Sequence, residues 1–160
     1  MPVTEPSNIS EKQDWHRQLA KQCNNRAWAL SVQPRSAAEN LEMLTTAHAS
    51  AYHWAQVGTE LNRMRAAMLL AEVHALLGHG ATALDLANEM RAYFLGRSDT
   101  PDWELAFAHA IYAHCACRAG RTDLHRSAYA AAVAALAATA DEEDRKVVAQ
   151  TFAHVPAPAP

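Results

Sequence analysis

The prolines and glycines of this chain stand only where a helix can begin or end. Proline inside a helix costs about 3 kcal/mol and glycine about 1 kcal/mol relative to alanine, so a helical chain keeps both at its boundaries. The prolines are at positions 2, 6, 34, 101, 156, 158 and 160, and the glycines are at 58, 78, 80, 96 and 120. None of them interrupts a periodic apolar segment. Their spacing predicts an all-α chain of about seven helices, paired as antiparallel hairpins.

Capping residues place the starts of these helices, which are expected near residues 10, 36, 59, 81, 101, 122 and 141. Ser36 and Glu39 match a capping box, in which the two side chains satisfy free backbone N–H groups at the helix start. The other expected caps are Thr59, Thr100 (followed by Pro101), Thr122 and Asp141. The predicted organisation is a disordered N-terminus over 1–9, one helical-repeat domain over 10–153, and a disordered Pro/Ala tail over 154–160.

Two neighbouring glycines are expected to differ in their tolerance of a side chain. Gly78 follows a long helical pattern, so it is predicted to take the left-handed conformation that only glycine adopts without strain. Gly80 falls in the turn that follows, where alanine is expected to be tolerated.

Composition supports helices and argues against several classes of partner. Alanine, the best helix former, fills 36 of 160 positions, whereas isoleucine occurs only twice. The net charge is −3 and the basic residues are scattered, so neither nucleic acid nor an anionic membrane is an expected partner. Three cysteines fit free thiols in a reducing compartment. We therefore expect a cytoplasmic protein, and the abundance of alanine and arginine suggests a bacterial source.

An internal repeat appears when Gly78 is aligned with Gly120, 42 residues further on. Each glycine follows a long Ala-rich helical pattern and precedes another. Small residues recur in the second helix of each unit, at Ala83 and Ala87 and again at Ala128 and Ala132. The repeated unit is therefore expected to be a helical hairpin.

This pattern resembles the tetratricopeptide class of helix-turn-helix repeats. Leu70, Ala71 and Gly78 match the first helix of that pattern, and Ala83 matches the second. The period is longer than the usual 34 residues, and no proline closes each repeat. The chain also resembles a group of small bacterial repeat proteins of unsettled function, through residues 47–54, 58–59, 62, 65–66, 73–78 and 105–108. The resemblance implies an α-α superhelix and a protein-binding scaffold.

The repeat alignment also suggests a binding groove lined by the first helices of each hairpin. It places one set of side chains of the helix near residues 59–77 on the groove side, and a matching set in the next repeat. The predicted partner-binding residues are Asn62, Arg65, Met68, Glu72, Phe107 and His114. Two alternatives stay open, because Arg65 and Glu72 could instead lie on a solvated face or form a buried polar network between hairpins.

A second candidate site is the segment from His48 to Trp54, which is dense in aromatic and imidazole groups. The alternative ligand pocket would use His48, Tyr52, His53 and Trp54, with His114 as a further candidate in a His-rich site. Packing of these side chains between helices is the competing interpretation. The spacing of the histidines does not supply the three or four ligands that zinc needs.

No catalytic motif and no phosphate-binding loop is present in the sequence, so no enzyme activity and no cofactor are expected. The predicted function is a non-catalytic scaffold that binds a protein or peptide through its groove. A homodimer formed through an Ala-rich face of the helix near residues 122–138 is a second interaction hypothesis. A ligand- or metal-binding domain, with or without enzyme activity, is the alternative from another functional class.

Overall fold

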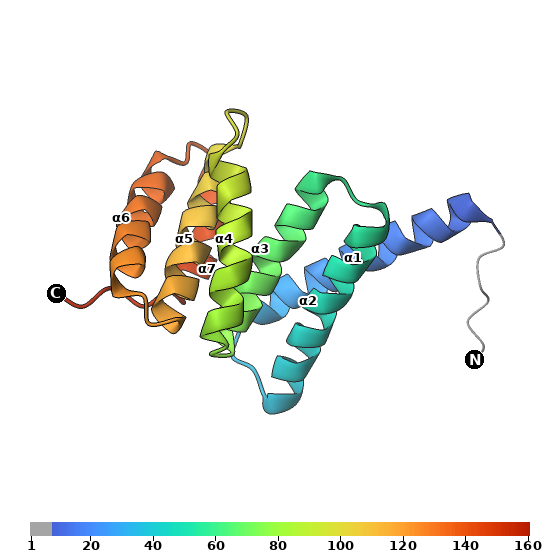
Figure 1. Ribbon diagram of the computed structural model, residues 1–160, viewed down its shortest axis with the longest axis horizontal. Coiled ribbons are helices and arrows are strands. Elements are labelled where there is room, and N and C mark those ends of the chain that lie inside the picture. The colour runs from blue at the N-terminus through green and yellow to red at the C-terminus, as the bar shows by residue number, and fades with distance from the viewer. Residues whose placement is uncertain (1–7) are drawn as a thin grey trace.

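The computed structural model describes residues 8–160, which form seven α-helices (Figure 1). Successive helices pack side by side, and no β-strand occurs in this part of the chain. The all-α array predicted from the sequence is confirmed. The helices are α1 (Ile9–Ser31), α2 (Ala37–Val57), α3 (Glu60–Leu76), α4 (Gly80–Leu95), α5 (Asp102–Arg118), α6 (Thr122–Ala138) and α7 (Glu142–Phe152). Residues 1–7, most of the segment predicted to be disordered, lie outside the described residues.

The helix starts follow the capping chemistry only in part. Ser36 and Glu39 form the predicted capping box, and Asp141 accepts a hydrogen bond from the backbone N–H of Asp144. Thr59 also caps its helix as predicted. The predicted caps Thr100 and Thr122 are wrong. The Thr100 hydroxyl donates to the Phe94 carbonyl, and α6 begins at Thr122 without a side-chain cap.

The internal repeat is present in the helices with no change of register. Adding 42 to the bounds of α3 gives Asp102–Arg118, the bounds of α5, and adding 42 to Gly80 gives the first residue of α6. Gly78 and Gly120 have φ angles of +80° and +70°, and they are the residues with positive φ within residues 8–160. Each sits in the same pair of backbone hydrogen bonds at a helix end. The left-handed conformation predicted for Gly78 is confirmed.

The core is organised around α3 and α5, which are buried on more than one side. One cluster joins α1, α2 and α3 through Leu30, Met43 and Leu69. A larger cluster joins α3 to the helices that follow it, and it includes Phe94 and Ile111. Because α3 contributes to both clusters, it holds the first hairpin against the rest of the array. In Figure 1, α1 and α2 lie at one end of the array and α6 lies at the other.

The chain after α7 is packed at its start. Val155 is buried, and the carbonyl oxygen of Pro156 lies 2.7 Å from Nε2 of His125 on α6. The structure therefore differs from the predicted disordered tail at residues 155 and 156, where a buried apolar side chain and a hydrogen bond hold the chain. Within the described range, no helix combines the length and apolar character needed to cross a membrane.

Gly80 is the point of closest backbone approach between α4 and the end of α5. A Cβ atom there would overlap the backbone of Arg118 and lie 2.8 Å from the amide nitrogen of Ala119. At Gly78 a Cβ atom would meet nothing within 4 Å, so only the positive φ resists a side chain. The expectation that Gly80 tolerates alanine is therefore wrong, because the turn lies against another helix end.

We predict that Gly80→Ala destabilises the protein more than Gly78→Ala. The first change forces two backbones apart, which typically costs about 1–3 kcal/mol. The second adds only the cost of a left-handed residue, about 1 kcal/mol. Chemical unfolding of both variants measures the difference. A lower unfolding free energy for Gly78→Ala would contradict the close approach described here.

Candidate functional site

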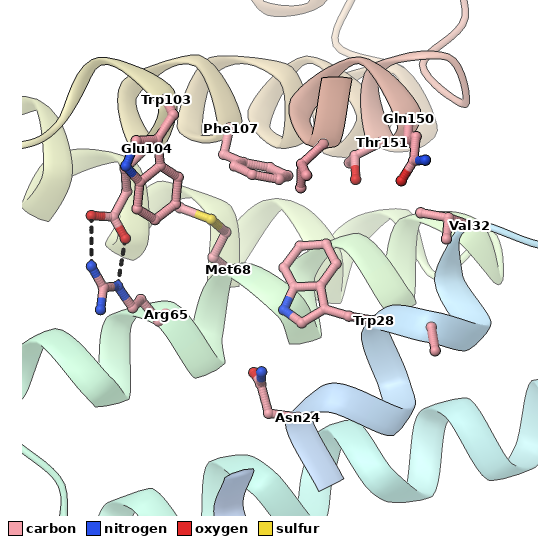
Figure 2. A pocket seen from close by; sticks show the side chains of 12 residues that line it. Asn24, Trp28, Val32, Arg65, Met68, Trp103, Glu104, Phe107, Gln150 and Thr151 are labelled. Atoms are coloured by element: carbon pink, nitrogen blue, oxygen red, sulfur yellow. Dashed lines mark hydrogen bonds and ion pairs between the residues drawn. The ribbon is translucent and has the colours of Figure 1, made fainter. Parts of the chain in front are cut away.

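A cavity of about 450 Å³ opens between the odd-numbered helices, which are the first helices of the three hairpins together with α7 (Figure 2). This is the face on which the sequence predicted a groove. The cavity is lined by Asn24, Trp28, Ala29, Val32, Arg65, Met68, Trp103, Glu104, Phe107, Val147, Gln150 and Thr151. Its size falls within the range of about 300–1,000 Å³ that is typical of ligand-binding pockets.

Aromatic side chains form much of the cavity wall. The ring of Phe107 lies 5.6 Å from that of Trp28 and 6.1 Å from that of Trp103, measured between centroids. Figure 2 shows the thioether of Met68 beside Trp103, on the α3 side. Trp28 and Trp103 are only partly buried, so both indole rings keep area that a partner can cover.

One ion pair bounds this apolar wall. Arg65 on α3 donates from Nε and Nη2 to the two carboxylate oxygens of Glu104 on α5, over 2.6 Å and 3.1 Å. Glu104 is 2% exposed, whereas Arg65 is 42% exposed. The guanidinium carbon of Arg65 lies 5.8 Å from the ring centroid of Trp103. The hydrogen bonds from Glu104 raise the pKa of Arg65, so this cation is held in its charged form.

The structure divides the six predicted partner-binding residues. Arg65, Met68 and Phe107 line the cavity together. Asn62 does not, because its side chain completes the capping box with Thr59.

Glu72 and His114 lie in the core instead of on the cavity wall. They are 1% and 0% exposed, and Nδ1 of His114 is 3.0 Å from a carboxylate oxygen of Glu72. Nε of Arg118 donates to Nε2 of His114 over 3.4 Å, so Nε2 is an acceptor and Nδ1 carries the proton. The predicted buried network between hairpins therefore exists, but its members are Glu72, His114 and Arg118. Burial and nearby Glu72 also raise the pKa of the Cys115 thiol, which disfavours a reactive thiolate.

The residues of the alternative ligand pocket fall into two separate contacts. Nδ1 of His53 is 2.7 Å from Nδ1 of His16 on α1, and Tyr52 lies beside this pair. His48 instead faces His74 on α3, whose Nδ1 is 3.0 Å from Nδ1 of His79.

Trp54 is partly buried and packs toward Gly58 at the end of its own helix. None of these four predicted residues lines the cavity between the odd-numbered helices. Across residues 8–160, no group of three or more His, Cys, Asp or Glu side chains is arranged to hold a metal ion.

Comparison of this chain with protein-family models, with curated proteins and with solved structures finds no match. The cavity and the contacts around it are therefore the observations on which a function can be argued.

Several lining residues were not expected from the sequence. On α1, Asn24, Trp28 and Val32 contribute to the cavity, and their spacing of four residues places them on one helix face. This spacing was a usable signal. Glu104 gave no such signal, because its position beside the helix start suggested only a favourable interaction with the helix dipole.

We predict that Arg65→Ala lowers stability by about 1–3 kcal/mol, because Glu104 would keep a buried carboxylate without its partner. Arg97→Ala is the matched control, since it breaks a bidentate pair with Asp99 in which both side chains are largely exposed. Exposed pairs contribute about 0–1 kcal/mol. Urea unfolding of both variants gives the comparison, and equal small losses would contradict a structural role for Arg65.

Stability should fall as the pH decreases from 7.5 to 5.5. Burial is the main cause that lowers the pKa of His53 and His74, followed by the neighbouring histidines. Burial and then Arg91 lower the pKa of His109. Unfolded histidine titrates near pH 6.5, so below this pH the unfolded chain binds more protons than the folded chain. The stabilisation is therefore complete above about pH 6.5 and is lost toward the lowered pKa values.

Thermal melts between these pH values check this prediction. His74→Gln should reduce the pH dependence, whereas the same change at the exposed His154 should preserve it. A melting temperature that stays constant or rises on acidification would contradict the sign derived above.

Proposed function

We propose that this protein is a non-catalytic module that binds a protein or peptide partner in the cavity between its odd-numbered helices. The observation that carries the proposal is the cavity wall itself, where four helices bring together two tryptophans, a phenylalanine and a methionine. Aromatic residues and methionine are enriched at protein interfaces, and aromatic anchors dominate binding energy there.

The electrostatics of the cavity also support binding more than catalysis. The charged side chains that line it, Arg65 and Glu104, are committed to each other. A catalytic acid or base has to be free to exchange a proton with a substrate, whereas here the carboxylate accepts two hydrogen bonds from a guanidinium. The pair serves better as a fixed, neutral border to an apolar surface.

The further proposals rest on less specific features. The 42-residue helical hairpin repeat supports a tetratricopeptide-like scaffold, although its period exceeds the 34 residues of that class. Cys23, Cys115 and Cys117 are free thiols, which supports a cytoplasmic location. A bacterial source and a homodimer through α6 stay predictions. The alternative His-rich ligand site is supported less, because its histidines are divided between two contacts.

The groove is tested by selecting binding peptides from a random display library and measuring their affinity for two variants. Val147 lies on the cavity rim and is 53% exposed, so Val147→Glu adds a charge there without burying it in the core. We expect this change to weaken selected peptides at least about tenfold, equivalent to ~1.4 kcal/mol, because an apolar partner would desolvate the new carboxylate.

Val133→Glu is the matched control, because it makes the same change on the outer face of α6 at a residue that is 49% exposed. It should leave peptide affinity unchanged, and its effect on molecular mass in solution also tests the predicted homodimer. If no selected peptide distinguishes the Val147 variant from the parent protein, the proposed binding site is wrong.

A further inference from the structure

We propose that the occupant of this cavity is a non-helical peptide segment that inserts an uncharged aromatic side chain and offers its backbone carbonyl groups to donors around the rim. This inference rests on the proposed function and specifies the chemistry of the partner. Three features carry it: the ring-lined wall, the internally neutralised charge, and a set of polar groups that have no partner inside the protein.

The shape and lining of the cavity favour an aromatic anchor. The three rings of Trp28, Trp103 and Phe107 stand at tilted or perpendicular angles, so they present both faces and edges toward the space between them. An inserted ring can make stacked and edge-to-face contacts, each worth more than simple burial of apolar area. The volume accommodates an indole or phenyl ring together with part of the adjoining backbone.

The charge balance of the cavity disfavours a charged anchor of either sign. An acidic side chain could approach Arg65 only in competition with Glu104, whose carboxylate is almost fully buried and depends on that guanidinium. A basic side chain would meet a carboxylate that already accepts two hydrogen bonds. Because an unpaired charge in an apolar site is costly, the complementary side chain is uncharged.

The rim, in contrast, has donors to spare. Within residues 8–160, neither the amide of Gln150 nor the indole N–H groups of Trp28 and Trp103 have a hydrogen-bond partner, and Nη1 of Arg65 is likewise unused. Figure 2 shows Gln150 on α7, across the cavity from Asn24 and Trp28 on α1. Indole and guanidinium groups only donate, so their natural partners are carbonyl oxygens.

This excess of donors is the reason to infer a non-helical segment. In a helix the interior carbonyl groups already accept hydrogen bonds from the backbone four residues ahead, and they have little to offer a neighbouring surface. An extended or turn-like segment keeps its carbonyl groups available on both sides of the anchoring residue. Rings and free donors together therefore favour such a segment over an amphipathic helix.

The probe is the capped tripeptide Ac-Gly-Trp-Gly-NH₂, compared with the same peptide carrying Glu, Lys or Ala at its centre and with 3-methylindole. Binding is followed at millimolar peptide through the indole N–H signals in nitrogen–proton NMR spectra. The four tryptophans provide an internal control, because Trp28 and Trp103 line the cavity and Trp15 and Trp54 do not.

We expect the tryptophan peptide to shift the signals of Trp28 and Trp103 and to bind at least about tenfold more tightly than the Glu, Lys or Ala peptides. It should also bind several-fold more tightly than 3-methylindole, which has the ring but no carbonyl groups. In Gln150→Ala this second preference should narrow, because one donor is removed from an exposed position without disturbing the core.

Tighter binding of the Glu or Lys peptide would overturn the neutral-anchor inference, as would shifts confined to Trp15 and Trp54. Equal binding of 3-methylindole and the tryptophan peptide would overturn the backbone contribution and favour a small-ligand pocket. If the tryptophan peptide fails while library peptides still lose affinity in Val147→Glu, this inference is wrong but the proposed function stands. If both fail, the proposed function fails as well.

Discussion

Glu72 and His114 bring a carboxylate and an imidazole together at the centre of the array, out of reach of water. Each group would be costly to bury alone, so α3 and α5 are constrained to the one relative position in which the two side chains meet. Arg118 completes the network from the next turn of α5 by donating to the other ring nitrogen. We interpret the network as a determinant of register, since apolar residues of similar volume often stabilise a core equally well.

The same two helices carry most of the cavity wall, so their register determines the site. Met68 and Arg65 on α3 face Phe107 and Glu104 on α5 across the cavity, and the Arg65–Glu104 pair is a second polar tie between these helices. A slip of α3 along α5 would break both ties and move the aromatic rings apart. Stability and the shape of the binding surface therefore depend on one helix contact, with the first hairpin and α7 adding the remaining walls.

The sequence predicted the elements of this fold well because glycine and proline act locally. The positive φ of Gly78 and Gly120 and the 42-residue offset could be inferred without knowing any tertiary contact. The side-chain roles could not. Whether Glu72 faces the groove or the core depends on a histidine 42 residues away, and helical periodicity does not distinguish these outcomes when a helix is buried on several sides. Gly80 was misjudged for the same reason, since its constraint comes from Arg118.

The Arg65–Glu104 pair links the fold of this protein to the selectivity inferred for its cavity. A partner carboxylate that displaced Glu104 from Arg65 would leave an anion that is 2% exposed without its counter-charge. Its gain in the cavity would be offset by an equivalent loss inside the protein, so an acidic anchor gains little net affinity. An uncharged ring leaves the pair intact and gains the full benefit of the aromatic wall. The cavity therefore discriminates against charge through the stability of the folded state itself, without any repulsive residue on its surface.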